Sequence, residues 1–226
     1  MRLDEKSLSK KFEQDLGISL EIAASERGVD LRQLSPREQI RYRSLEGLPR
    51  RESWLKGRSA LKRLLLRLGE EDDTSEVIFP HGRFSLTHSG RYAVAVGTDS
   101  DRLRGIGVDL EVGRSPHPES ARFFLTPEER DWINRQRESD RPGHLLRLWT
   151  AKESLFKADP GNDETALSDY RMKDPGAWGG TAFVRHRRDV EMRYASSPCG
   201  EGWISIAICQ RVCEEIPARL RPPLIC

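Results

Sequence analysis

The sequence predicts an α+β fold built from two similar halves, residues 1–104 and 105–226, that pack together as a pseudo-dimer. Three observations lead to this prediction. A helix-start signal occurs twice, further segments match in the same order along the chain, and strand-like apolar runs lie between amphipathic helical segments. Each match alone could arise by chance, so the prediction depends on their common order.

The two helix-start signals are Leu34–Glu38 and Leu125–Glu129, which read Leu-Ser-Pro-Arg-Glu and Leu-Thr-Pro-Glu-Glu. In each segment the hydroxyl residue can accept a hydrogen bond from a free backbone N–H of the first turn. Pro suits the first helical position, and the Glu three residues after the cap can reach back. Both segments therefore predict the start of a helix.

Three further pairs of segments follow the same order, the first two at offsets of 90 and 95 residues: Gly17–Glu21 with Gly107–Glu111, Trp54–Lys62 with Trp149–Lys157, and, more weakly, Tyr92–Val96 with Trp203–Ala207. This alignment puts Ser19 in the place of Asp109 and Arg58 in the place of Glu153. We therefore expect one active site per chain, with acids from the second half and cations from the first.

Patterning predicts the main elements. Strands are expected over Val77–Phe79, Phe84–Leu86, Tyr92–Val96, Ile106–Leu110 and Trp203–Cys209, between Gly- and Pro-containing turns. A helix is expected over Leu145–Ala158, where Asp159-Pro160-Gly161 ends it. Surface loops are expected around Asp174–Gly180 and Ser196–Gly202, and a peripheral tail after Cys213.

Composition narrows the function classes. Charged residues make up 33% of the chain, the formal net charge is only +2, and no apolar run approaches the ~20 residues of a membrane helix. We expect a cytoplasmic monomer that binds neither membrane nor nucleic acid. The cysteines, Cys199, Cys209, Cys213 and Cys226, match no zinc pattern, and Cys209 is expected as a buried free thiol. The basic stretch Arg50–Arg67 suits either a local anion site or a solvated helix face.

Two acids on one predicted strand are the first candidate site residues. Asp109 and Glu111 lie two positions apart, so both side chains leave the same face, while Val108 and Leu110 face a core. Two neighbouring carboxylates repel each other unless they are solvated or bridged by a cation. Their chemistry suits Mg²⁺, and exposed acids at a strand edge are the alternative.

Glu153 and Lys157 lie four residues apart and share a helix face, with Lys152 beside them. They form either an ordinary surface ion pair or a third metal ligand with two lysines that neutralise a polyphosphate. Phosphoryl transfer requires the second arrangement, because its catalysis consists mostly of positioning and charge stabilisation. The turn Thr87-His88-Ser89-Gly90 could cradle phosphate, although a lone His is more often simply a surface residue.

These segments resemble a known signature. Gly107–Glu111 followed by Trp149–Lys157 is similar to the G-[VI]-D-x-E strand and W-x-x-K-E-[SA]-x-x-K helix of the 4′-phosphopantetheinyl transferase superfamily. Leu86–Gly90 and Arg122–Phe124 also match, and the two-half organisation resembles the surfactin-synthetase-type branch. The resemblance extends from about Leu34 to Ala207.

The resemblance implies Mg²⁺-dependent transfer of the phosphopantetheine arm of coenzyme A to a serine of an apo acyl or peptidyl carrier protein, which is expected to be acidic and helical. It implies these roles: Asp109, Glu111 and Glu153 as magnesium ligands, Lys157 and His88 at the pyrophosphate, Arg58, Arg83, Thr87 and Ser89 at the nucleotide, and Glu128 as a helper in activating the serine hydroxyl. The carrier protein is expected near Phe123 and Phe124, of which at least one ring is expected in the core, and near residues 160–180.

One departure concerns the adenine end, where Gly82-Arg83-Phe84 stands in place of the usual Gly-Lys-Pro. The competing hypothesis is a non-catalytic protein that binds nucleic acid through the basic stretch Arg50–Arg67. It leaves Asp109, Glu111 and Glu153 without a role.

Overall fold

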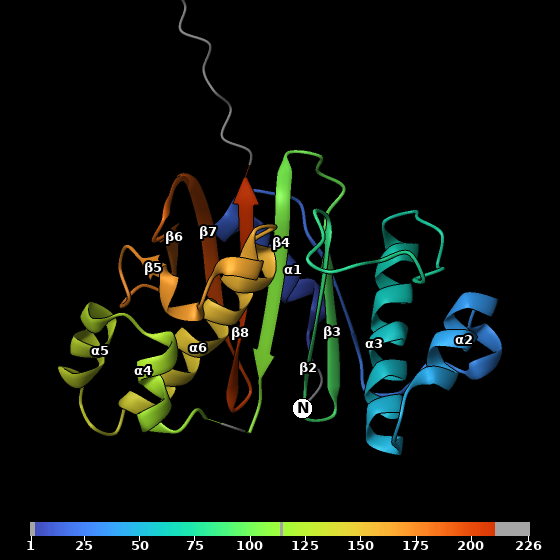
Figure 1. The fold of residues 1–226 in the computed structure, drawn as a ribbon, viewed down its shortest axis with the longest axis horizontal. Coiled ribbons are helices and arrows are strands. Elements are labelled where there is room, and N and C mark those ends of the chain that lie inside the picture. Colours follow the sequence, from blue (N-terminus) through green and yellow to red (C-terminus); the bar gives the residue numbers. More distant parts are fainter. Residues whose placement is uncertain (1–2, 114, 211–226) are drawn as a thin grey trace, which may run out of the picture.

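The computed structural model describes residues 3–113 and 115–210, which form a mixed α+β fold with two antiparallel sheets (Figure 1). The α-helices are α1 (Glu5–Leu16), α2 (Pro36–Ser44), α3 (Leu48–Arg67), α4 (Ala121–Phe124), α5 (Pro127–Asn134) and α6 (Arg141–Ala158). The strands are β1 (Glu21–Ser25), β2 (Phe84–Ser89), β3 (Tyr92–Gly97), β4 (Leu103–Glu111), β5 (Tyr170–Met172), β6 (Gly179–Val184), β7 (Arg187–Cys199) and β8 (Gly202–Gln210). Short 3₁₀ helices span Leu31–Gln33, Pro118–Ser120, Asn162–Glu164 and Leu167–Asp169. Helices long and apolar enough to cross a membrane do not occur in the described ranges.

The strands form two sheets with the orders β1-β3-β2 and β4-β8-β7-β6-β5. Strand β2 of the first sheet lies beside β4 of the second, and serine side chains connect them. Ser85 Oγ accepts from the backbone N–H of Val108 at 3.0 Å, and Ser89 Oγ accepts from that of Val112 at 2.9 Å. Because Ser85 and Ser89 lie four positions apart on one strand, they present their hydroxyls to the same neighbour. The two sheets therefore meet at a seam bridged by side-chain hydroxyls.

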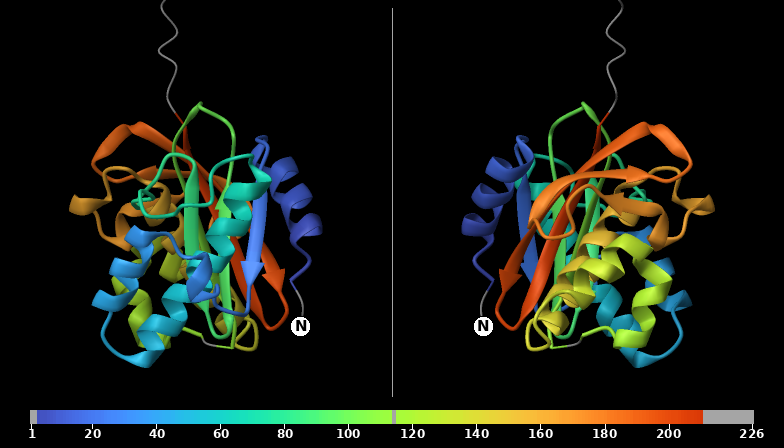
Figure 2. Two further views of the ribbon diagram at one scale, coloured as in Figure 1. Left: turned by 90° about the vertical axis from the view of Figure 1, so that its right-hand side faces the viewer. Right: turned by 90° about the vertical axis from the view of Figure 1, so that its left-hand side faces the viewer.

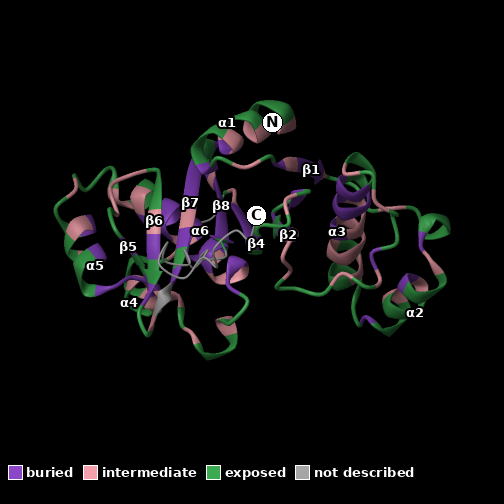
Figure 3. Cartoon of the chain, turned by 90° about the horizontal axis from the view of Figure 1, so that it is seen from above, coloured by how far each residue is buried: buried purple, intermediate pink, exposed green. Residues whose placement is uncertain are grey.

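Helices cover the sheets from opposite sides. Helix α1 and helix α6 lie on different sides of the strands (Figures 2 and 3). On the α1 side, both sheets contribute to one core that includes Phe12, Leu16, Val94, Val108 and Ile206. On the other side, α3 packs against the three-stranded sheet, and α4 to α6 pack against the five-stranded sheet. The shared core ties the two sheets into one body.

The two predicted helix starts are confirmed. Ser35 and Thr126 each form a complete capping box with Glu38 and Glu129, at the N-termini of α2 and α5. Each of these Glu residues also forms a buried ion pair with a lysine of the following long helix. Glu38 lies 2.9 Å from Lys62 of α3, and Glu129 lies 2.7 Å from Lys152 of α6. The repeated signal therefore anchors a long helix in each half.

Most predicted elements are present, and three corrections follow from the structure. Val77–Phe79 is not a strand, and Ser196–Gly202 is not a surface loop, since it contains the end of β7 and the turn into β8. Gly17–Glu21 does not form the strand expected from its match with β4. Gly17 ends α1 with a φ of 69°, a conformation that favours glycine, and β1 begins only at Glu21. Cys209 is a buried free thiol as predicted, whereas Cys213 and Cys226 lie outside the described residues.

Two glycines of β4 allow α6 to lie directly on the strand. A Cβ on Gly105 would come within 2.0 Å of the carbonyl oxygen of Ala158, and one on Gly107 within 1.9 Å of that of Ser154. Both contacts are with helix backbone, which cannot move away without shifting the whole helix. The missing side chains therefore set the distance between β4 and α6, and with it the positions of the groups that α6 carries.

We expect Gly107→Ala to destabilise the fold by about 1–3 kcal/mol or more, because the added methyl overlaps the α6 backbone. Denaturant unfolding followed by circular dichroism would measure the free energy of unfolding. Gly143→Ala is the matched control, since a Cβ at that helical position meets nothing within 4 Å. This control should be neutral or stabilising by up to about 1 kcal/mol. Equal effects of the two substitutions would contradict the close-packing argument.

Candidate active site

The two acids of β4 face the hydroxyl residues of β2 across the seam between the sheets. Thr87 Oγ1 donates to Asp109 Oδ1 at 3.0 Å, and Ser89 Oγ donates to Glu111 Oε2 at 3.2 Å. Asp109 is buried and Glu111 is half-buried, whereas Val108 and Leu110 point into the core on the opposite face. The predicted alternation along this strand is therefore confirmed.

Helix α6 adds a third acid and a lysine to the same place. Lys157 Nζ lies 2.7 Å from Asp109 Oδ1 and donates to the carbonyl oxygen of Val108 at 3.3 Å. Glu153 lies one turn earlier on the same helix face and is close enough to Asp109 and Glu111 for their charges to raise its pKa. The structure thus brings together the three acids and the lysine that the sequence singled out.

The three carboxyl groups all have raised pKa values. Burial is the main cause for Asp109, opposed by the charge of Lys157. Burial also raises the pKa of Glu111, and the charge of Asp109 raises it further. For Glu153, burial raises the pKa, Lys157 opposes it, and the other two carboxylates add to it. The cluster therefore carries more negative charge than its single lysine compensates.

One oxygen of Asp109 has no partner among the described residues. Among the described residues, Oδ2 of Asp109 finds no hydrogen-bond partner although it is buried. Such an atom is costly unless something binds it. The hard oxygen donors of this cluster suit Mg²⁺. In the described part of the chain, however, no three His, Cys, Asp or Glu side chains converge as a ready-made metal site. The donor set thus fits an ion that also takes ligands from a bound phosphate, as Mg²⁺ usually does, and not one that the protein encloses alone.

His88 lies at the end of β2, where α3 approaches closely. A Cβ on Gly57 of α3 would lie only 2.7 Å from His88 Nε2, so this glycine makes room for the ring. Burial lowers the pKa of His88, a hydrogen bond with the backbone of Ser53 opposes this, and the charges of Arg58, Lys157 and Lys56 lower it further. The imidazole therefore lies among cations, opposite the acids of β4.

The side chain of Arg58, near His88, is held by contacts within the protein. Its Nη1 donates to Thr74 Oγ1 at 3.1 Å, and its guanidinium lies 5.3 Å from the ring centroid of Trp54. Lys56, which was not among the predicted site residues, lies near His88, and its charge lowers the pKa of the imidazole. Its position two residues before Arg58 in the basic stretch was the available signal.

An open cavity of about 360 Å³ adjoins the acids, lined in part by His88, Ser89, Glu111, Leu146 and Trp149. Trp149 Nε1 donates to Glu111 Oε1 at 3.3 Å, and its ring packs edge-on against Phe124. Trp149 is part of the sequence motif, but no role was predicted for it. Its observed contacts orient Glu111 at the wall of the cavity.

Three predicted site residues are paired away from the acid cluster, and their roles in binding or activation stay predictions. Lys152 is fully buried and pairs with Glu129, because it leaves α6 on a different side from Glu153. Glu128 is exposed at the start of α5 and pairs with Arg171 at 3.2 Å. Arg83 pairs with Glu70 at 2.8 Å and donates to the carbonyl oxygen of Thr98.

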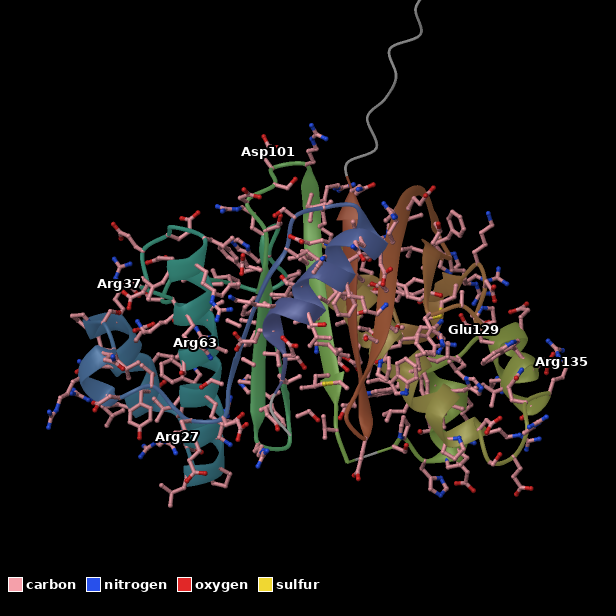
Figure 4. The ribbon with its side chains drawn as sticks, turned by 180° about the vertical axis from the view of Figure 1, so that it is seen from behind. Arg27, Arg37, Arg63, Asp101, Glu129 and Arg135 are labelled. Carbon is pink, nitrogen blue, oxygen red and sulfur yellow. The ribbon has the colours of Figure 1, made fainter. Side chains whose placement is uncertain are left out.

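None of these three contacts, all between described residues, involves the acid cluster. Figure 4 labels Glu129, the partner of Lys152, near α5, and Arg63 on α3 at the other side of the strands. Phe124 is buried in the core as expected for one ring of the Phe pair, and Phe123 is exposed.

Comparison with known proteins shows a similarity over the part of the chain that contains the acid cluster. Residues 105–199 match the family model of the 4′-phosphopantetheinyl transferase superfamily. The matched segment contains Asp109, Glu111, Glu153 and Lys157, and it supports the superfamily resemblance predicted from the motifs.

The chain is also similar to the 4′-phosphopantetheinyl transferase of Bacillus subtilis, with 28% identity over 99 residues. That alignment covers 43% of this chain and 42% of the relative, so it spans less than half of either protein.

We expect Glu153→Gln to stabilise the metal-free protein, because the substitution removes a carboxylate that is desolvated and repelled by its neighbours. A raised pKa means that the folded state binds the proton more tightly, so the gain should be absent at acid pH, where the carboxyl is protonated in both states. It should appear as pH rises through the pKa of Glu153. Thermal unfolding of both proteins between pH 4 and about 8 measures it.

The same experiment with added Mg²⁺ should reverse the order, since the wild type gains a bound ion that the variant binds weakly. A Glu153→Gln protein less stable than the wild type without metal at neutral pH would contradict the charge-repulsion argument.

Proposed function

We propose that the protein transfers the 4′-phosphopantetheine group of coenzyme A to a serine hydroxyl of an apo acyl or peptidyl carrier protein and releases 3′,5′-ADP. The observation that carries this proposal is the buried, uncompensated oxygen of Asp109 within a cluster of three acids and Lys157. An acid cluster that lies beside His88 and further cations is suited to hold a diphosphate together with a divalent ion. The superfamily match to residues 105–199 is consistent with this chemistry.

Asp109, Glu111 and Glu153 are the proposed ligands of Mg²⁺, which would supply charge neutralisation at the diphosphate. Lys157 and His88 are proposed to bind the diphosphate oxygens from the two sides of the seam, with Thr87 and Ser89 orienting the acids. Lys56 and Arg58 are the nearest cations for the 3′-phosphate, because both influence His88.

In the reaction, the serine oxygen forms a bond to the β-phosphorus, and the bond from that phosphorus to the bridging oxygen breaks. Glu153 is the proposed acceptor of the serine proton, because burial and the neighbouring carboxylates raise its pKa and make it a stronger base than an exposed Glu. Lys157 is positioned to stabilise the negative charge that develops on the departing 3′,5′-ADP.

The organisation of the chain as two halves around one site is also a proposal, as is the surfactin-synthetase-type branch. It is supported by the repeated anchors Glu38–Lys62 and Glu129–Lys152 and by the position of the acids at the seam between the sheets. A cytoplasmic monomer remains our expectation for the state in which the enzyme acts.

The basic stretch Arg50–Arg67 gives little support to the nucleic-acid hypothesis. Five of its cations are engaged within the fold: Arg51, Arg58, Lys62, Arg63 and Arg67 bind backbone or side-chain oxygens of the protein. Their use in the structure favours internal anchoring over a solvated binding face.

We expect Glu153→Gln to lower transfer by about 100-fold or more, because it removes both the proposed base and a metal ligand. Incubation with a fluorescent coenzyme A analogue, Mg²⁺ and a panel of apo carrier proteins, read by gel, measures the label transferred. Glu128→Gln is the matched control, since Glu128 is exposed and paired with Arg171 away from the cluster, and it should keep its activity. Near-normal labelling by the Glu153 variant would overturn the assignment.

A further inference from the structure

The two long helices are anchored in the same way, and the anchors fix which positions correspond. Lys62 and Lys152 each pair with the Glu of a capping box, so they hold equivalent places on α3 and α6. Counting onward from these lysines, Arg63 corresponds to Glu153, and Arg67 corresponds to Lys157. The offset is 90 residues and not the 95 expected from the Trp54 match, so Arg58 does not stand in the place of Glu153.

Strand β1 carries no acid toward the long helix beside it. Ala24 points into the core on the α1 side, whereas Ala23 packs with α3 and Ser25 donates to Ser59 of that helix. Asp109 faces α6, where Lys157 contacts it, so its place on β1 falls to a residue that faces α3 and not to Ala24. Ser19, the residue expected there, precedes β1. The second cleft, at β1 and α3, therefore lacks a strand acid, and Arg63 and Arg67 reach the backbone of β1 there.

A carboxylate from outside the repeat occupies this second cleft. Glu5 of α1 accepts from the backbone N–H of Ala24 at 2.8 Å, and its oxygens lie 3.3 Å from Arg63 Nη2 and 2.6 Å from Arg67 Nη2. The same arginines also donate to the carbonyl oxygens of Ala24 and Ile22. Helix α1 contacts both β1 and β7 and buries Phe12 and Leu16, so Glu5 is held from two directions.

The charges of this arrangement are the reverse of those at the acid cluster. There, three carboxylates face one lysine and leave an oxygen of Asp109 unpartnered. Here, two guanidinium groups face one carboxylate, and hydrogen bonds and charges from Arg67, Ala24 and Arg63 lower the pKa of Glu5 in spite of its burial. A cavity of about 430 Å³ lies directly beside Glu5, and its charged lining residues are the cations Lys6 and Arg63 and the acids Asp4, Glu5 and Glu26.

We propose that Arg63, Arg67 and the N–H of Ala24 form an anion site in the second cleft, and that Glu5 of α1 is its internal ligand. The external ligand class that fits is a small oxyanion such as phosphate, because two arginines and a backbone N–H are its usual partners. Glu5 keeps this site closed in the intact chain. The proposal is independent of the transfer reaction, since it uses residues outside the acid cluster.

The test is a thermal-unfolding comparison with and without saturating inorganic phosphate. Glu5→Ala should lower the Tm by about 3–8 °C, because two partly buried arginines lose their counter-ion. Phosphate should restore part of that loss in the variant and raise the Tm of the wild type much less. Asp15→Asn is the matched control on the same helix, because it removes only an exposed i,i+4 pair with Lys11 and should change the Tm little.

The triple variant Glu5→Ala, Arg63→Gln, Arg67→Gln should lose the extra response to phosphate. Equal phosphate responses in wild type and Glu5→Ala would overturn the proposal, since all binding would then occur elsewhere. If Glu5→Ala does not fold, Glu5→Gln keeps the size of the side chain and answers the same question. Carrier-protein labelling by Glu5→Ala should remain at the wild-type level. If the wild-type protein itself labels no carrier protein, the proposed transferase function is refuted, and the anion site is not.

Discussion

The direct contact between the α6 backbone and strand β4 is the constraint on which the site depends. It exists because Gly105 and Gly107 present no side chain where the carbonyl oxygens of Ala158 and Ser154 lie. At this separation Lys157 reaches both Asp109 and the backbone of β4. A larger residue at either glycine would push the helix outward and separate the lysine and Glu153 from the acids of the strand. The glycine before Val-Asp-Leu-Glu is therefore as much a part of the site as the acids themselves.

The seam between the sheets brings the second set of groups to the site. Ser85 and Ser89 replace part of a backbone ladder between β2 and β4, while Thr87 and Ser89 donate to the two acids. These hydroxyls thus connect the sheets and orient the carboxylates at the same time. His88, on the opposite side of β2 from them, is turned toward α3, where Gly57 admits its ring. The acids of β4 and His88 of β2 consequently come from different sheets, and the diphosphate proposed between them would bridge the two.

How much of this could be predicted depended on the range of the interactions. Capping boxes and strand alternation are local, so Ser35, Thr126 and the faces of Asp109 and Glu111 were predicted correctly from the sequence. The direction of Lys152 could not be predicted from its adjacency to Glu153, since successive helix residues point about 100° apart. Its partner Glu129 lies in another helix, and Arg171, the partner of Glu128, lies on strand β5. Such long-range pairs cannot be read from spacing, and neither can the orphaned oxygen of Asp109.

The buried pairs of Lys62 and Lys152 change the register of the proposed internal repeat. When the two halves are aligned by Trp54 and Trp149, Arg58 takes the place of Glu153, and the first half was therefore expected to supply this arginine to the site. Aligned by the buried pairs of Lys62 and Lys152, the replaced acid is Arg63, and it faces away from the site toward α1. Arg58 then belongs to a different group, the cations near His88 at the seam. The same helix therefore serves two clefts with different faces: one face supplies positive charge beside the acids of β4, and the other binds the carboxylate of Glu5. These contacts within the fold give Arg51, Arg58, Lys62, Arg63 and Arg67 roles that need no nucleic acid.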